Sequence, residues 1–106
     1  MIGIDIANIQ RFRNKSQTFL KKILHNEEIL EYSLLDFEED KLRFLATRWA
    51  IKEALFKCDN SFFYFNKINL KYNDRKYFIE HFEKQFFIST SNEENIVVAV
   101  VMKIKE

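Results

Sequence analysis

The sequence predicts an α+β fold, because helical and extended hydrophobic patterns occupy separate stretches of the chain. Apolar residues alternate strictly with other residues over positions 1–6, which is the pattern of a strand. Helical spacing then extends through residues 19–57, and strand patterns follow from residue 66 onward. Runs of helix and runs of strand in this order are typical of α+β domains.

The first strand places its apolar side chains on one face and its other side chains on the opposite face. Ile2, Ile4 and Ile6 share the apolar face, whereas Gly3 and Asp5 share the other. A glycine beside Asp5 would let a ligand approach the carboxylate closely. Alternatively, Asp5 caps the helix that follows. Position alone leaves these two roles open.

Two short helices and one long helix are expected next. Helical spacing of apolar residues occupies 19–24 and resumes over 29–32 after a polar break. The long helix is expected from about Glu38 to Lys57, because acids lie in its first turn and a lysine near its last. Its apolar stripe is expected to contain Leu42, Leu45, Ala46, Trp49, Glu53 and Phe56.

Strand patterns separated by Asn and Asp turns follow at residues 66–72, 76–82 and 84–90. A last strand is expected at 96–104, where a run of Val and Ala suggests burial on both faces. With one glycine and no proline in the chain, turns that need a positive φ must rely on Asn and Asp. No repeat or linker interrupts the pattern, so one domain spanning residues 1–106 is expected.

The composition excludes several classes of protein. A hydrophobic content of 47% supplies a core, which excludes a disordered tail. A net charge of +1 is too balanced to hold a nucleic acid by bulk charge, so no nucleic-acid partner is expected. The single glycine excludes the Gly-rich phosphate loops of ATP and NAD folds. Because the sequence contains one cysteine, no signal peptide and no membrane-spanning run, we expect a cytoplasmic protein without a membrane partner.

The N-terminal half is dipolar although the net charge is close to zero. Five basic residues and no acid lie between Ile6 and Asn26. Seven acids and no Lys or Arg then lie between Glu27 and Asp40. An anionic partner would therefore meet a local basic patch rather than a uniformly charged surface.

Glu53 is the unusual residue of the long helix, because it falls on the stripe that should be apolar. Burying an unpaired carboxylate costs several kcal/mol, so a cation or a metal is expected beside it. Lys57 lies four residues further on, and such a surface pair contributes about 0.3 to 0.5 kcal/mol. That simpler interpretation explains Lys57 but not the aromatic residues around Glu53. Together with Asp5, Glu53 would suit Mg²⁺ that is shared with substrate phosphates.

Other polar residues offer weaker signals. Arg48 and Lys52 lie four residues apart on the long helix and would either grip phosphates or form a solvated face. The run from Ser89 to Asn92 offers hydroxyl and amide donors, although most such runs are turns.

Two segments resemble the holo-acyl-carrier-protein synthases, which are small phosphopantetheinyl transferases. Residues 3–12 are similar to the family's G-[IV]-D-[IL]-x-x-[IL]-x-R segment, and residues 49–57 are similar to its [WF]-x-x-K-E-[AS]-x-x-K segment. A looser likeness covers residues 88–91 and 96–101. The resemblance implies an antiparallel sheet packed against one long helix and shorter helices.

The resemblance implies an enzyme of fatty acid synthesis that transfers 4′-phosphopantetheine from coenzyme A to a serine of apo acyl carrier protein. Adenosine 3′,5′-bisphosphate is released. It implies that Asp5 and Glu53 hold Mg²⁺ and that Lys57 pairs with phosphate charge, which makes these three the expected catalytic residues. It also implies coenzyme A contacts, which are expected at Arg48, Lys52, Lys57, Ser89 and Asn92. The resemblance leaves open which base takes the serine proton: a metal-bound water, or Glu28, which aligns with a commonly acidic family position.

Carrier proteins of this kind are acidic, so the acid-free basic segment is the expected docking surface. Its members are Arg11, Arg13, Lys21 and Lys22. The resemblance further implies a homotrimer with coenzyme A in clefts between protomers. The aromatic segment 62–65 would serve either such an interface or the core.

Two positions depart from the family pattern. Asn92 stands where the family usually has His, and residues 58–61 replace a glycine-containing loop. An Asn amide donates hydrogen bonds but carries no positive charge, so weaker phosphate binding is expected.

Two other functions are alternatives to phosphopantetheine transfer. A non-catalytic carrier-protein binding module would have no need of Asp5, Glu53 and Lys57, which argues against it. A small RNA-binding domain would show RNA binding, and a flat response to added RNA would exclude it.

Overall fold

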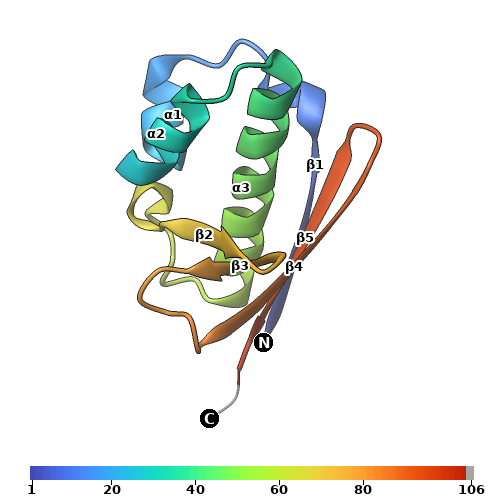
Figure 1. The fold of residues 1–106 in the computed structure, drawn as a ribbon. Helices are drawn as coiled ribbons and strands as arrows, with labels where there is room; N and C mark the ends of the chain where they lie inside the picture. Colours follow the sequence, from blue (N-terminus) through green and yellow to red (C-terminus); the bar gives the residue numbers. More distant parts are fainter. Residues whose placement is uncertain (105–106) are drawn as a thin grey trace.

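One long helix lies along one face of an antiparallel sheet, and two short helices flank its N-terminal half (Figure 1). The computed structural model describes residues 1–104. The elements are β1 (Ile2–Asn8), η1 (Ile9–Phe12), α1 (Gln17–Ile23), α2 (Asn26–Ser33), α3 (Glu38–Cys58), η2 (Phe65–Lys67), β2 (Leu70–Asn73), β3 (Lys76–Ile79), β4 (Phe86–Glu93) and β5 (Ile96–Lys103). The predicted α+β class and the predicted sheet on one long helix are confirmed.

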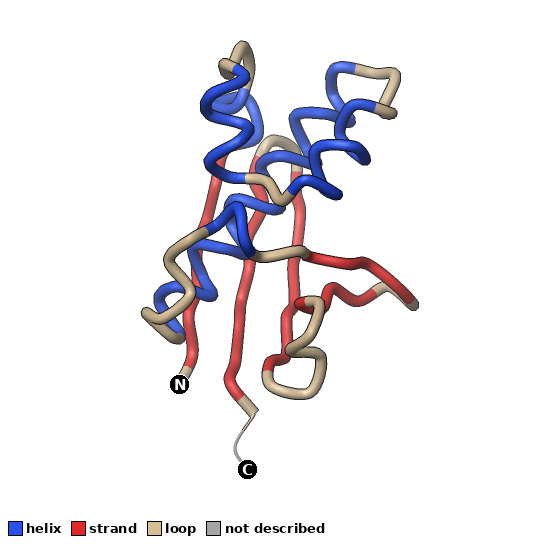
Figure 2. The backbone as a smooth tube through the Cα atoms, turned by 90° about the vertical axis from the view of Figure 1, so that its left-hand side faces the viewer, coloured by secondary structure: helices blue, strands red, loops and turns tan. Residues whose placement is uncertain are grey.

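The described residues form two antiparallel sheets. In the larger sheet the C-terminal strand β5 lies between β1 and β4, and the smaller sheet is the β2–β3 hairpin. Figure 2 shows this hairpin projecting away from the three long strands. Within residues 1–104, none of the helices combines the length and the apolar character needed to cross a membrane.

The boundaries of the long helix agree with the prediction, whereas those of the strands do not. The strand expected at 66–72 begins only at Leu70, because residues 65–67 form a 3₁₀ turn. The strand expected at 84–90 is shifted to Phe86–Glu93. Positive φ angles occur at the Asn and Asp turns but also at Arg75, His81 and Glu94, so the turns rely on Asn and Asp only in part.

Gly3 allows β1 and α3 to pack closely. A Cβ atom on Gly3 would lie 1.8 Å from the carbonyl oxygen of Ala54 and 2.8 Å from the backbone nitrogen of Cys58. The helix backbone therefore occupies the space beside this glycine. The expectation that Gly3 admits a ligand is wrong, because the role of the missing side chain is the contact between strand and helix.

The opposite face of the larger sheet is apolar and exposed. Ile2, Ile4 and Ile6 are 64%, 56% and 61% exposed. Along β5, buried residues alternate with half-buried ones, because α3 covers only one face of the sheet. The expected burial of the last strand on both faces is therefore wrong for a single chain.

Candidate active site

Asp5 and Lys57 meet where β1 passes the last turn of α3. The Lys57 Nζ atom donates to Asp5 Oδ1 at 3.1 Å and to the carbonyl oxygen of Ile4 at 3.0 Å. The side chain of Lys57 is half exposed, whereas that of Asp5 is only 14% exposed. The lysine thus has room to meet a ligand while it remains paired with the carboxylate.

Glu53 lies one turn before Lys57 on the same helix and completes a cluster with Asp5. Partial burial, and then the negative charge of Asp5, raise the pKa of Glu53, while Lys57 and Arg11 oppose the shift. The carboxylates of Asp5 and Glu53 are therefore close enough to repel each other. The structure brings together Asp5, Glu53 and Lys57, the three expected catalytic residues, which come from β1 and α3.

The donor atoms of this cluster fit a magnesium ion. Asp5 Oδ2 is buried and has no hydrogen-bond partner among the described residues, so its lone pairs are available to a cation. Two carboxylates from separate elements are hard oxygen ligands of the kind that Mg²⁺ prefers. Residues 1–104 contain no group of three or more His, Cys, Asp or Glu side chains able to hold a metal. Water and substrate would therefore have to supply the remaining ligands.

An aromatic cluster surrounds Trp49, which lies on α3 one turn before Glu53. The Trp49 ring packs against Phe12, Phe19 and Phe65, with ring centroids about 6 Å apart in each pair. The guanidinium of Arg11 lies over the rings of Phe12 and Trp49, at 4.9 Å and 5.4 Å. Arg11 therefore stands at the edge of the candidate site, close enough to lower the pKa of Glu53. From the sequence alone, Arg11 is expected only on the docking surface.

Lys52 and Glu28 form a buried ion pair. Both side chains are fully buried, and Lys52 Nζ lies 2.5 Å from Glu28 Oε1. Burial lowers the pKa of Lys52 to about 8, although Glu28 opposes this shift. A phosphate cannot reach this ammonium and a substrate proton cannot reach this carboxylate. Two expectations are therefore corrected, because Lys52 does not face coenzyme A and Glu28 is not placed to act as the base.

Arg48 is also buried, on a different side of α3 from Glu53. Its guanidinium lies 3.7 Å from the ring centre of Phe44 and 4.0 Å from the carboxylates of Glu28 and Glu31. Five residues along an α-helix correspond to a rotation of about 140°. Arg48 and Glu53 therefore do not face the same cleft within one chain. Because Arg48 and Lys52 are both buried, they form neither the phosphate-binding row nor the solvated face that their spacing predicts.

The comparisons with known proteins agree with this geometry. The family described as the 4′-phosphopantetheinyl transferase superfamily matches residues 1–101. The chain belongs to this superfamily. It is 47% identical to a holo-[acyl-carrier-protein] synthase of Mycoplasma mobile over 103 residues, which cover 97% of this chain and 88% of the relative. It is 48% identical to the synthase of Mycoplasmopsis pulmonis, covering 98% of this chain and 90% of the relative.

A solved structure shows the same fold. The holo-(acyl-carrier-protein) synthase of Bacillus anthracis, described as a complex with CoA (3′,5′-ADP), is 27% identical and superposes with a TM-score of 0.80. The match covers 94% of this chain and 91% of that chain. The resemblance stated from the sequence is confirmed, and the chain is a phosphopantetheinyl transferase of the holo-acyl-carrier-protein synthase type.

Ser89 and Asn92 of this transferase are exposed on β4, where they lie on opposite faces of the sheet. Ser89 pairs in register with Val100, whereas Asn92 pairs with the buried Val97. Ser89 lines a cavity of about 770 Å³ between β4 and the β2–β3 hairpin. Neither residue contacts the Asp5–Glu53–Lys57 cluster through any hydrogen bond within residues 1–104.

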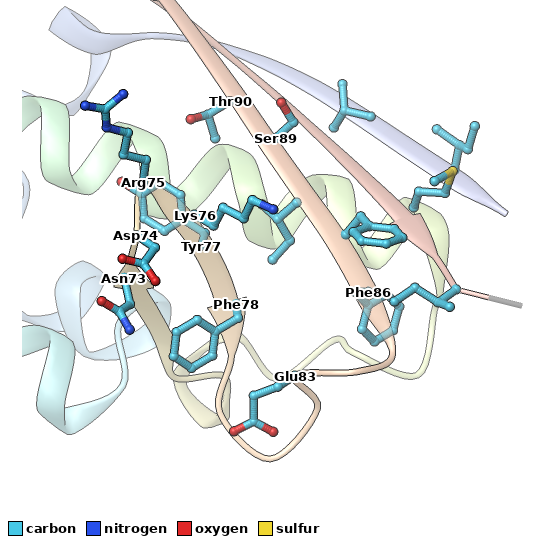
Figure 3. Close-up of a pocket in the computed structure, with 16 residues that line it drawn as sticks. Asn73, Asp74, Arg75, Lys76, Tyr77, Phe78, Glu83, Phe86, Ser89 and Thr90 are labelled. Carbon is cyan, nitrogen blue, oxygen red and sulfur yellow. The ribbon is translucent and has the colours of Figure 1, made fainter. Parts of the chain in front are cut away.

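Two basic side chains that the sequence alone does not indicate also line this cavity. Arg75 and Lys76 line it from the hairpin, opposite Ser89 and Thr90 on β4 (Figure 3). The only local signal was the Asn and Asp turn that precedes them. That turn indicates a hairpin tip but does not indicate which strand it faces.

The four expected docking cations are exposed but not equivalent. Arg13 pairs with Glu39 at 2.9 Å and lies 3.8 Å from Glu38, at the start of α3. Its charge is therefore partly balanced within the chain. Lys21 and Lys22 are exposed near the end of α1, so with Arg11 they form the more accessible part of the basic surface.

Proposed function

We propose that this transferase moves the 4′-phosphopantetheine arm of coenzyme A onto a serine hydroxyl of an apo acyl carrier protein. The serine hydroxyl gives its proton to a water molecule and its oxygen bonds to the phosphorus of the arm. The bond from that phosphorus to the bridging oxygen breaks, and adenosine 3′,5′-bisphosphate leaves. The observation that carries the proposal is the cluster of Asp5, Glu53 and Lys57. We infer the carrier protein as a substrate from the names of the relatives, and coenzyme A as the other substrate from the Bacillus anthracis complex.

The residues of the cluster have distinct parts in this proposal. Asp5 and Glu53 would hold Mg²⁺, which when bound neutralises phosphate charge and stabilises the leaving group. Lys57, half exposed beside Asp5, would meet the negative charge of the same phosphates.

The lone thiol of Cys58 is free, which suits the reducing cytoplasm as the compartment of the reaction.

The direct test is intact-mass spectrometry of an apo acyl carrier protein incubated with this protein, coenzyme A and Mg²⁺. The carrier should gain about 340 Da, the mass of one phosphopantetheine group added covalently, and EDTA should prevent the gain. A folded protein that binds the carrier but produces no gain would favour the non-catalytic binding module.

We further propose that the active form is a homotrimer with coenzyme A bound between protomers. On the outer face of the larger sheet, β1 and β5 both expose aliphatic side chains. An exposed apolar surface of this kind is typical of an interface between protein molecules. Moreover, Ser89, one of the expected coenzyme A contacts, faces away from Glu53 within one chain, because it pairs with Val100 on the same outer face as Ile4. A second protomer would bring such a group to the same ligand.

The substitution Ile4→Glu should convert the trimer to monomers. Ile4 pairs with Val100 in the middle of the outer face, so a glutamate there would place charge in an apolar interface. Light scattering after size exclusion would measure the mass of the assembly. The affinity for coenzyme A should fall when the trimer dissociates. Leu34→Glu, at a residue that is 79% exposed at the C-terminal end of α2, is the matched control. A monomeric wild type would contradict the proposal.

The substitution Arg11→Glu should raise the apparent KM for the carrier protein by about tenfold, a change equivalent to about 1.4 kcal/mol. Charge reversal on the docking surface would disfavour the encounter with an acidic partner. The KM for coenzyme A should stay nearly unchanged. Steady-state kinetics with each substrate varied in turn would measure both constants, and Lys84→Glu, in the loop between β3 and β4, supplies the same charge change elsewhere. Equal effects on both constants would assign Arg11 to the coenzyme A site instead.

A further inference from the structure

The buried pair of Lys52 and Glu28 lies between the end of one helix and the start of the next. Lys52 Nζ donates to the carbonyl oxygen of Ile23, the last residue of α1, at 2.8 Å. It also donates to the carbonyl oxygen of Phe65, in η2, at 2.9 Å. Glu28 accepts from the backbone nitrogen of His25, the N-cap of α2, at 2.9 Å. Through these hydrogen bonds the pair connects α1, α2, α3 and η2 in the interior.

The hydrogen bonds of both groups are complete within the protein. An ammonium has three donors, and Lys52 uses them on Glu28, Ile23 and Phe65. The Glu28 carboxylate accepts from Lys52, from His25 and from the backbone nitrogen of Leu70 at 3.1 Å. Each charge also has the sign that its helix end favours, with the cation at the C-terminus of α1 and the anion at the N-terminus of α2. No donor of the lysine is left for a ligand.

The helix that this pair holds is the one that carries the docking lysines. The backbone of α1 lies mainly against η2 and α2, so its connection to α3 depends on side chains. One connection is the stacking of Phe19 on Trp49, at 6.0 Å. A second is Lys52, which adjoins Glu53 in the sequence. Lys52, which holds the end of α1, therefore belongs to the same turn of α3 as Glu53, the candidate metal ligand.

We propose that Lys52 and Glu28 are positioning residues that hold α1 at a fixed place relative to the catalytic end of α3. A carrier protein bound to Lys21 and Lys22 then presents its serine to the Asp5–Glu53–Lys57 cluster. This inference rests on the proposed function for its kinetic consequence, but the position of α1 can be tested without any reaction.

The first measurement is amide hydrogen exchange on the double variant Glu28→Gln/Lys52→Met. The double change removes both charges of the pair, and the glutamine retains an oxygen that can accept from His25. Arg48, which lies near Glu28, keeps Glu31 as a carboxylate neighbour at 4.0 Å. Exchange should accelerate at the amides of residues 17–24 by at least about tenfold, with the amides of α3 unchanged. Lys84→Met, a loss of a surface lysine, should leave both segments as in the wild type. Equal acceleration in α1 and α3 would overturn the proposal in favour of a general effect on stability.

The second measurement separates the two substrates in steady-state kinetics of the same variant. The KM for the carrier protein should rise by about tenfold, because a loosened docking helix no longer aligns the serine. The KM for coenzyme A should stay within about twofold, since Lys52 does not reach that ligand. A rise confined to coenzyme A would overturn the proposal, as would an unchanged carrier KM with a loosened α1. If the wild type transferred nothing, the proposed function would fail while the exchange measurement still decided the place of α1.

Discussion

Replacing Glu53 with glutamine is expected to lower kcat by about 10³-fold while leaving the melting temperature and the assembly mass near those of the wild type. Glutamine retains the shape of the side chain but removes the charge that would hold Mg²⁺ and stabilise the transition state. Folding should not suffer, because burial and Asp5 raise the pKa of Glu53 in the folded chain. A raised carboxyl pKa means that the ionised form opposes folding at neutral pH, so its removal costs no stability through charge.

Steady-state kinetics, differential scanning calorimetry and light scattering would measure the kcat, the melting temperature and the assembly mass on the same sample. Glu94→Gln, at the exposed turn between β4 and β5, makes the same chemical change away from the site and should retain wild-type activity. If Glu53→Gln instead unfolded the protein, the residue would be structural and the metal assignment would lose its support.

The second large effect is expected from Gly3→Ala, which should lower the free energy of unfolding by about 3 kcal/mol. The added methyl group would lie 1.8 Å from the carbonyl oxygen of Ala54, and a backbone atom cannot yield as a flexible side chain does. The strand must therefore move away from α3. Because Asp5 is two residues further along β1, activity should fall together with stability.

Urea denaturation at a fixed chain concentration would measure the loss, so that any change in assembly does not alter the comparison. Ser91→Ala, at an exposed residue of the same sheet, should change the free energy of unfolding by less than about 0.5 kcal/mol. A stable and active Gly3→Ala variant would contradict the close packing of β1 on α3.

Local periodicity was sufficient to predict the long helix and the faces of the first strand. The acids at one end of α3 and the lysine at the other marked its limits to within one residue. The alternation at the N-terminus correctly separated Asp5 from the isoleucines. The spacing of Glu53 and Lys57, read with the family resemblance, pointed to a cluster with Asp5 that the structure assembles.

Periodicity did not predict what covers each face of α3. Lys52 and Arg48 have the spacing of a solvated row, yet α1, α2 and η2 enclose the first, and Phe44 with Glu28 encloses the second. Phe44 is a neighbour of Arg48 in the helix, but the spacing of residues 48–52 does not indicate the distant segments, because Ile23, Glu28 and Phe65 lie more than ten positions away in the sequence. The same limit explains why Glu28 was a plausible base by alignment but is a buried partner in the fold.

By itself, then, the sequence determined the α+β class and the family, and it supplied the residues that we propose for the reaction, because these depend on residue type and local spacing. Only the tertiary structure decided the role of Gly3, the burial of Lys52 and the exposure of one apolar sheet face. Each of these depends on which element packs against which, and that choice is made by the chain as a whole through close packing and the pairing of buried charges.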